Sequence, residues 1–160
     1  MEILKLNWDT ISVYCSDLSS SIRSDKYKPD VIVALSRGGL VPARLISDHL
    51  GISLIFVLGL KLYQKIGQKT DSPKITQDLN SDLSGKKVLL VDDVSDSGKS
   101  LSFAKDYLLK KGASNVRCAT LHYKPGSKFK PDYFVHTTHL WICYPWEVNE
   151  VEKELSKLEK

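Results

Sequence analysis

The stretch Val88-Leu89-Leu90-Val91-Asp92-Asp93-Val94-Ser95-Asp96-Ser97-Gly98-Lys99-Ser100-Leu101 decides the fold of this 160-residue chain. Residues 88–91 form an apolar run of Val and Leu, which is typical of a strand buried on both faces. Two carboxylates and a loop of small residues follow, and apolar residues then recur at helical spacing from Leu101. Strand, loop and helix in this order indicate an α/β protein, whose ligands bind beyond the carboxyl ends of parallel strands.

The loop at residues 96–100 has the composition of an anion site. Its backbone N–H groups and two hydroxyls can surround a phosphate at the positive end of the next helix. Gly98 allows close approach of the backbone, and Lys99 adds a positive charge. Asp92 and Asp93 are hydrogen-bond acceptors only when ionised, which suits the hydroxyls of a sugar. The whole stretch therefore fits a ribose 5-phosphate.

A plainer interpretation of the same residues is a strand, turn and helix without a ligand. In that case Asp96 would cap the helix and the Asp92-Asp93 pair would face water. The order of buried strand, acid pair, third acid, glycine and hydroxyls favours the binding site.

The stretch also resembles the phosphoribosyl pyrophosphate (PRPP) signature of type I phosphoribosyltransferases, two acidic residues followed by Asp-Thr/Ser-Gly-Lys-Thr/Ser. Every signature position is matched, with serine at Ser97 and Ser100. The resemblance covers roughly residues 31–147 and implies an α/β fold with a mainly parallel central sheet flanked by helices. Strand and helix patterns alternate from Val31 to His122, which independently predicts such a sheet.

We expect one domain over residues 1–160. The resemblance implies a core at about 28–123 and a small hood at about 1–12 and 124–150, made from the two ends of the chain.

A second loop, Ser36-Arg37-Gly38-Gly39, lies between an apolar run at 31–35 and a helical pattern at 40–50. Its N–H groups can face an anion, and Arg37 supplies a permanent charge. A Gly-Gly turn in such a position is common without any function. Next to the PRPP-like signature, however, it is similar to the family's pyrophosphate-binding loop. The resemblance implies that Ser36, Arg37, Gly38 and Gly39 bind pyrophosphate and that the Ser36–Arg37 peptide is cis.

The segment 61–82 is polar, and a connection of this length is more often a functional loop than a packed element, although a short hairpin around Pro73 is an alternative. Residues 61–80 correspond to the family's mobile loop, which closes over the reacting centre and excludes water. Related 6-oxopurine enzymes carry Ser-Tyr here, whereas this chain has Leu62-Tyr63. Tyr63 is therefore the candidate lid residue. Surface disorder is the other interpretation of this segment.

The last third of the chain is expected to bind the base. Lys124 matches a lysine that donates to the purine 6-oxo group in similar purine enzymes. Trp141-Ile142, within Trp-Ile-x-x-Pro-Trp-Glu, resembles the stacking segment of bacterial xanthine-guanine enzymes. An indole offers stacking area, and a lysine is a donor without acceptor capacity. A solvated lysine and a core tryptophan are the alternatives.

The implied reaction moves the 5-phosphoribosyl group from PRPP to a 6-oxopurine (hypoxanthine, guanine or xanthine), giving nucleoside 5′-monophosphate and pyrophosphate in purine salvage. By the same resemblance Asp96 is the catalytic acid/base group. Asp92 and Asp93 bind the ribose and Mg²⁺, directly or through water, and residues 96–100 (Asp96, Ser97, Gly98, Lys99 and Ser100) bind the 5′-phosphate. An adenine enzyme and a non-catalytic PRPP- or nucleotide-binding regulator are the alternatives.

Composition agrees with a small-molecule enzyme. The net charge is +4 and the lysines are dispersed, so we expect no nucleic-acid surface. No apolar run approaches the ~20 residues that span a bilayer, and the N-terminus does not resemble a signal peptide. Three widely spaced cysteines suggest reduced thiols in a cytoplasmic protein. Family members are usually homodimers, which the resemblance implies here.

Overall fold

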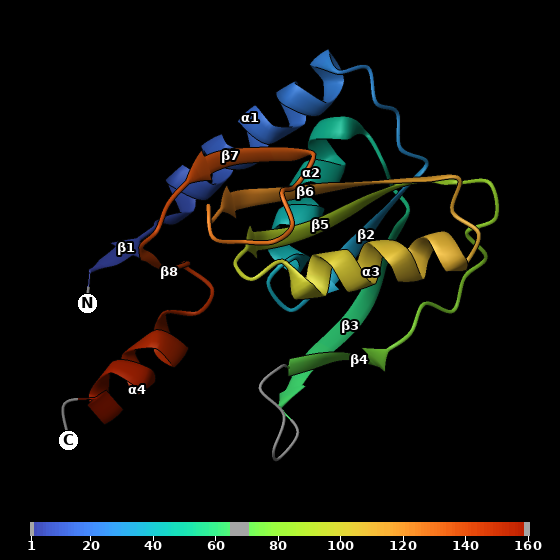
Figure 1. Cartoon of the computed structure of the whole chain (residues 1–160). Coiled ribbons are helices and arrows are strands. Elements are labelled where there is room, and N and C mark those ends of the chain that lie inside the picture. The colour runs from blue at the N-terminus through green and yellow to red at the C-terminus, as the bar shows by residue number, and fades with distance from the viewer. Residues whose placement is uncertain (1, 65–70, 159–160) are drawn as a thin grey trace.

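The computed structural model describes the backbone of residues 2–64 and 71–158, and the side chains of 2–62 and 73–157 (Figure 1). Its centre is a six-stranded sheet with the order β4-β3-β2-β5-β6-β7. The strands are β2 (Val31–Ser36), β3 (Ile55–Gln64), β4 (Asp71–Gln77), β5 (Lys87–Ser95), β6 (Asn115–Tyr123) and β7 (Tyr133–Thr137). Neighbouring strands are parallel except for the β3–β4 pair. The expected α/β fold class is thereby confirmed.

Three helices cover the two faces of the sheet, α1 (Trp8–Ser24) and α2 (Leu40–Leu50) on one face and α3 (Lys99–Lys110) on the other (Figure 1). Alternate residues of β5 belong to two separate cores, because successive strand side chains point to opposite faces. Leu89 and Val91 pack with α1 and α2, whereas Val88 and Leu90 pack with α3. All four side chains are fully buried, as the apolar run predicts. Among the described residues, no helix combines the length and apolar character needed to cross a bilayer.

The two ends of the chain meet in a second, two-stranded sheet. In it, β1 (Ile3–Lys5) pairs in parallel with β8 (Trp141–Cys143), and Ile3 lies opposite Trp141. The final helix α4 (Val148–Leu158) follows β8 (Figure 1). This arrangement places Trp141 and Ile142 beyond the carboxyl end of β5, where they line a hollow with Asp93.

The expectation of a loop at 61–82 is wrong for residues 61–64 and 71–77, which form two antiparallel strands as the hairpin alternative predicts. Strand β3 continues to Gln64, and β4 returns antiparallel to it. Pro73 lies inside β4 opposite Leu62 and not at a turn. A proline is tolerated there because β4 is an edge strand. The backbone of Tyr63 lies in β3 opposite Ser72, but its side chain lies outside the described part of the chain, as does the segment 65–70, so its lid role stays a prediction.

Candidate active site

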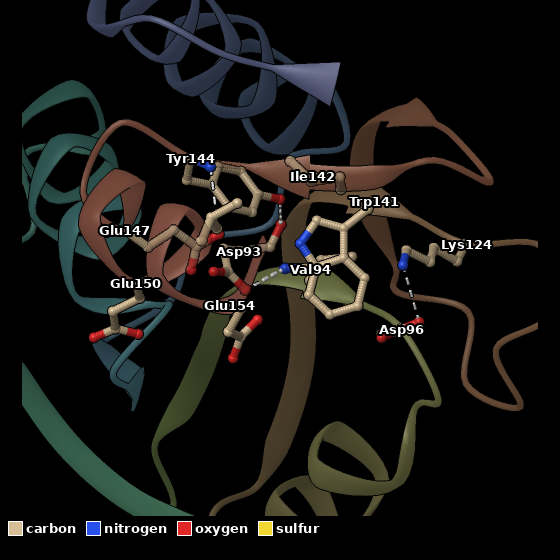
Figure 2. Close-up of a pocket in the computed structure, with 11 residues that line it drawn as sticks. Asp93, Val94, Asp96, Lys124, Trp141, Ile142, Tyr144, Glu147, Glu150 and Glu154 are labelled. Atoms are coloured by element: carbon tan, nitrogen blue, oxygen red, sulfur yellow. Dashed lines mark hydrogen bonds and ion pairs between the residues drawn. The ribbon is translucent and has the colours of Figure 1, made fainter. Parts of the chain in front are cut away.

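Three adjoining hollows at the carboxyl ends of β2 and β5 form one cleft. We name them by one residue each. The Trp141 hollow, shown in Figure 2, is lined by Asp93 and Asp96. The Arg37 hollow is lined by Asp92 and Asp93, and the Ser97 hollow by Asp92 and Asp96. Each of the three carboxylates thus borders two of the three hollows. The structure brings together the acids, both loops and the aromatic segment that the sequence suggests.

The loop after β2 packs directly onto β5. These strands are parallel neighbours, with Ala34 opposite Val91, so their carboxyl ends lie together. A Cβ on Gly38 would lie 2.4 Å from Oδ2 of Asp93, and a Cβ on Gly39 would lie 2.2 Å from the carbonyl oxygen of Val91. Such distances exclude any larger residue without a shift of β5 or the loop. The two glycines therefore allow the loop to reach the acid pair.

The backbone and side chains of this loop have distinct surroundings. The Ser36–Arg37 peptide is cis, as expected. The N–H of Gly39 donates to the carbonyl of Leu35 at 2.9 Å. Ser36, Arg37 and Gly38 line the Arg37 hollow. The guanidinium of Arg37 is exposed and forms an ion pair with Glu150 of α4, at 2.8 Å between Nη2 and Oε2.

Asp92 and Asp93 are carboxylates for which the charged form is costly. Oδ1 of Asp92 accepts from the N–H of Asp93 at 2.9 Å, and Oδ1 of Asp93 accepts from the N–H of Val94 at 2.7 Å. Burial raises the pKa of Asp93 to about 6, and the nearby charge of Glu147 adds to the effect. Burial, followed by the charge of Asp93, raises the pKa of Asp92 well above its usual value. A ligand or ion that brings positive charge here would relieve this cost.

The loop after β5 ends at the first turn of α3. Gly98 is the N-cap residue, with φ +81°, and no side chain caps the helix. Asp96 therefore does not cap α3, and Asp93 is buried and does not face water, unlike the arrangement that the plainer strand–turn–helix interpretation expects. Ser97, Gly98 and Ser100 line the Ser97 hollow.

Lys99 does not line the Ser97 hollow. It lines a neighbouring hollow with Phe103 and Phe129, which Ser97 and Gly98 also border. A Cβ on Gly98 would lie 2.6 Å from Cβ of Phe129, so this position also requires glycine for close packing. The N–H of Lys128 donates to the carbonyl of Ser97 at 3.2 Å, which ties the loop to the segment after β6.

Lys124 and Trp141 meet in the Trp141 hollow. Nζ of Lys124 lies 3.3 Å from Oδ1 of Asp96 and 5.9 Å from the centroid of the Trp141 ring. The lysine is mostly buried, at 20% side-chain exposure, whereas Trp141 is 45% exposed. Neither the solvated lysine nor the core tryptophan is observed. Ile142, the third expected residue, is buried and also lines this hollow.

A second group of residues that line the Trp141 hollow was not predicted from the sequence, and all of them come from the segment after β8. These are Tyr144, Glu147, Glu150 and Glu154, which Figure 2 labels, together with Val151. The charged pattern of α4 was visible in the sequence, but periodicity does not show where a terminal helix docks. Burial raises the pKa of Glu147. Three acidic side chains, Glu147 just before α4 and Glu150 and Glu154 within it, therefore border the cleft opposite the Lys124–Asp96 pair.

Tyr144, which lines the Trp141 hollow, joins two core strands. Its hydroxyl lies 2.8 Å from Nδ1 of His122 in β6 and 3.1 Å from the carbonyl oxygen of Asp93 in β5. Both side chains are buried. Burial, followed by the charge of His136, lowers the pKa of His122 to about 4, so the imidazole is neutral near pH 7.

Fold and cleft together define a phosphoribosyltransferase, with paired acids and two glycine-containing loops at adjacent strand ends. A family model described as the phosphoribosyl transferase domain matches residues 7–153, and the chain belongs to this family. A solved structure of purine phosphoribosyltransferase from Pyrococcus horikoshii is 38% identical, has a TM-score of 0.83, and aligns over 91% of this chain and 94% of that one.

Two further relatives extend the comparison. Xanthine phosphoribosyltransferase 1 of Saccharomyces cerevisiae is 27% identical over 195 residues, covering 95% of this chain and 93% of the yeast protein. The structure of a hypothetical protein from Neisseria gonorrhoeae with bound ppGpp is 29% identical, with a TM-score of 0.83, and covers 99% of this chain and 98% of that one.

Proposed function

We propose that this phosphoribosyltransferase transfers the 5-phosphoribosyl group from PRPP to a 6-oxopurine base in purine salvage. One observation carries the proposal: each of the three acids Asp92, Asp93 and Asp96 borders two of the three hollows. A ribose held at the acids would therefore reach a pyrophosphate in one hollow, a 5′-phosphate in the second and a base in the third. The names of the relatives from Pyrococcus and yeast support a purine as the acceptor.

PRPP would lie across the two loops. In this proposal Arg37 and Gly38, with Ser36 and Gly39, hold the pyrophosphate. The 5′-phosphate lies at the first turn of α3, against Ser97, Gly98 and Ser100 with Asp96 beside them, and Lys99 contributes positive charge from the neighbouring hollow. The ribose hydroxyls face Asp92 and Asp93.

The acid pair fits Mg²⁺. Carboxylate oxygens are the ligands that Mg²⁺ prefers, and a dication would offset the cost of charging two buried carboxyls. Within the described ranges, no cluster of three or more potential metal ligands exists. Asp92 and Asp93 would therefore hold the ion together with substrate oxygens and water, directly or through that water. When bound, Mg²⁺ would neutralise charge on the departing pyrophosphate.

The chemistry follows from the charge that develops on the ribose. Departure of pyrophosphate leaves an electron-poor sugar, which Asp92 and Asp93 stabilise through the hydroxyls. Trp141 stacks on the purine while Lys124 donates to its 6-oxo group. Asp96 lies within reach of the same hollow and takes or shares the N7 proton as N9 forms the new bond. A lysine donor faces an oxo group well and the amino group of adenine poorly, which favours 6-oxopurines.

The gonococcal structure supports a second use of the cleft. It holds ppGpp, and it is similar to this chain over nearly the full length. We propose that guanosine nucleotides with pyrophosphate groups also bind here. They would compete with PRPP, because both ligands carry phosphate groups that would contact the loops after β2 and β5. A regulator without catalysis would bind such ligands and release no pyrophosphate.

We also propose a cytoplasmic homodimer with the core and hood arrangement of the family. Support for reduced surroundings comes from Cys15, Cys118 and Cys143, which are buried free thiols. Leu40, next to the Arg37 loop, is 41% exposed and offers apolar surface to a second copy. Light scattering after gel filtration measures the mass: a dimer is expected, and a monomer at micromolar concentration would contradict it.

Pyrophosphate release tests the proposed reaction. The protein is mixed with PRPP, Mg²⁺ and each of hypoxanthine, guanine, xanthine and adenine in turn. We expect release that depends on a 6-oxopurine and is inhibited by ppGpp competitively with PRPP. Turnover with adenine alone would indicate the adenine enzyme, and PRPP binding without turnover would indicate the regulator.

A further inference from the structure

A single buried hydroxyl connects the base-binding segment to the strands that carry the acids. Tyr144 follows Trp141 and Ile142 by three and two residues, and it is 1% exposed. Its hydroxyl lies between Nδ1 of His122 and the carbonyl oxygen of Asp93. Figure 2 shows the contact with Asp93. His122 lies in β6, two residues before Lys124. The hydroxyl of Tyr144 therefore links the segment that carries Trp141 to the strand that carries Asp93 and to the strand that precedes Lys124.

The direction of these hydrogen bonds is set by chemistry. The carbonyl of Asp93 is an acceptor, so the phenol donates to it. The phenol oxygen then accepts from Nδ1–H of the neutral His122. In the described part of the chain, Nε2 of His122 is buried without a hydrogen-bond partner. In this tautomer Nε2 carries only a lone pair. A buried N–H group without an acceptor, which is rarer and costlier, is thereby avoided.

We propose that Tyr144 is a positioning residue for the base, because its hydroxyl fixes the Trp141–Ile142 segment relative to Asp93 and Lys124. This inference rests on the proposed purine binding in the Trp141 hollow. The other contacts of the tyrosine involve its ring or its backbone. The ring stacks on Trp146 at 4.7 Å and lies edge-on to the ring of His122 at 5.5 Å, and the N–H donates to Glu147 at 3.3 Å. Tyr144→Phe keeps these contacts and removes the hydroxyl alone.

The chain provides a matched control at the other end of the same strand. Tyr27 is 9% exposed, and its hydroxyl donates at 2.9 Å to the carbonyl of Val88, in β5. Tyr27→Phe also removes a buried hydrogen bond from a phenol to a β5 carbonyl, but far along the sequence from the base hollow. A general loss of stability would appear in both variants, whereas a positioning effect would appear only in Tyr144→Phe.

The partner of the hydroxyl gives a rescue experiment. His122→Leu removes the donor to the phenol oxygen, while His122→Asn retains an N–H close to the position of Nδ1. If the two side chains act as one unit, the Tyr144→Phe/His122→Leu double variant should show no further loss beyond either single variant.

The test measures KM for base and for PRPP, together with kcat and Tm, in wild type and variants. We expect Tyr144→Phe and His122→Leu to raise KM for the base about five- to tenfold, with KM for PRPP and kcat within about twofold. His122→Asn should remain close to wild type, and Tyr27→Phe should lower Tm without changing either KM. Nitrogen-15 spectra of His122 should show the proton on Nδ1.

The opposite results are equally clear. Equal changes in both KM values, the same base KM change in Tyr27→Phe, additive effects in the double variant, or a proton on Nε2 would each overturn the positioning role. Failure of the proposed function is seen separately, because the wild-type protein would then turn over none of the purine bases. That outcome would remove both proposals.

Discussion

Aspartates at the two ends of the central sheet have pKa values shifted in opposite directions. At the amino end, Asp25 accepts from Tyr133 at 2.6 Å and pairs with Arg117. The hydrogen bond from Tyr133, followed by the charge of Arg117, lowers the pKa of Asp25. At the carboxyl end, burial raises the pKa of Asp92 and Asp93. At the amino end, protein groups stabilise the charged form of Asp25. At the carboxyl end, the charged forms of Asp92 and Asp93 are costly in the substrate-free protein.

The amino-end cluster also fixes elements to one another. Arg117 in β6 lies over the ring of Tyr27, 4.5 Å from its centroid, and donates to the hydroxyl of Tyr133 in β7 at 2.6 Å. Asp25 is the C-cap residue of α1. The groups that stabilise the fold therefore lie at the opposite end of the sheet from those that would bind substrate, and strained charges commonly gather at functional sites.

The largest effect is expected from neutralising one acid at each end. Asp96→Asn should lower kcat by about 10²- to 10⁴-fold, because the acid/base group is lost, while Tm and PRPP binding stay near wild type. Asp25→Asn should do the reverse, lowering Tm and leaving kcat unchanged. Steady-state kinetics and thermal melts check both, and unchanged turnover in Asp96→Asn would remove that residue from its proposed role.

The second prediction concerns the cost of burying charge at the carboxyl end. Asp93→Asn should raise the free energy of unfolding of the substrate-free protein by about 1–3 kcal/mol at pH 8, because the amide carries no charge to desolvate. Activity should fall in the same variant. Urea titrations measure the gain, which should disappear at pH 4, where the carboxyl is already protonated. A variant less stable than wild type at pH 8 would contradict the assigned cost.

The third prediction follows from the same pKa values. Asp93 has a folded-state pKa of about 6, above its unfolded value of about 3.9. The folded state therefore binds this proton more tightly, and stability should decrease as the pH rises from about 4 to about 6. Asp25, with its lowered pKa, should add stability as the pH rises through its unfolded value. Urea titrations between pH 3 and pH 8 check both slopes, and the Asp93 component should be missing from Asp93→Asn.

The smallest effect is expected at the exposed Arg37–Glu150 pair. Glu150→Gln should change the free energy of unfolding by less than about 0.5 kcal/mol, since the two side chains are 78% and 56% exposed. The same change frees Arg37 and removes a negative charge beside the proposed pyrophosphate site. KM for PRPP should therefore fall a few-fold. Glu152→Gln, on the same helix but outside the hollows, is the control, and an equal fall there would contradict a local effect.

Much of the fold was predictable because its signals are local. The apolar run at 88–91 and the acids and glycine that follow lie within one short stretch, and the strand–loop–helix unit forms as that stretch suggests. The helix 40–50 is likewise bounded by Gly39 and Gly51, and Gly51 adopts φ +68°.

What could not be predicted depends on contacts between distant residues. Strand β1 has three residues, too few for a periodic signal, and it exists by pairing with Trp141 and its neighbours. The bond between His122 and Tyr144 joins two aromatic positions that the sequence places 22 residues apart. The docking of α4 beside Arg37 likewise depends on where its apolar residues, such as Val151, find a partner.

Pro73 in the edge strand β4 has a consequence for how copies of this protein meet. An open strand edge is a template on which a neighbouring chain can continue the sheet, and repeated addition leads to fibres. Pro73 has no N–H to offer, and Lys74 beside it brings a charge. Growth of the sheet from this border is therefore disfavoured, and crowded solutions of the protein should resist amyloid-like assembly there.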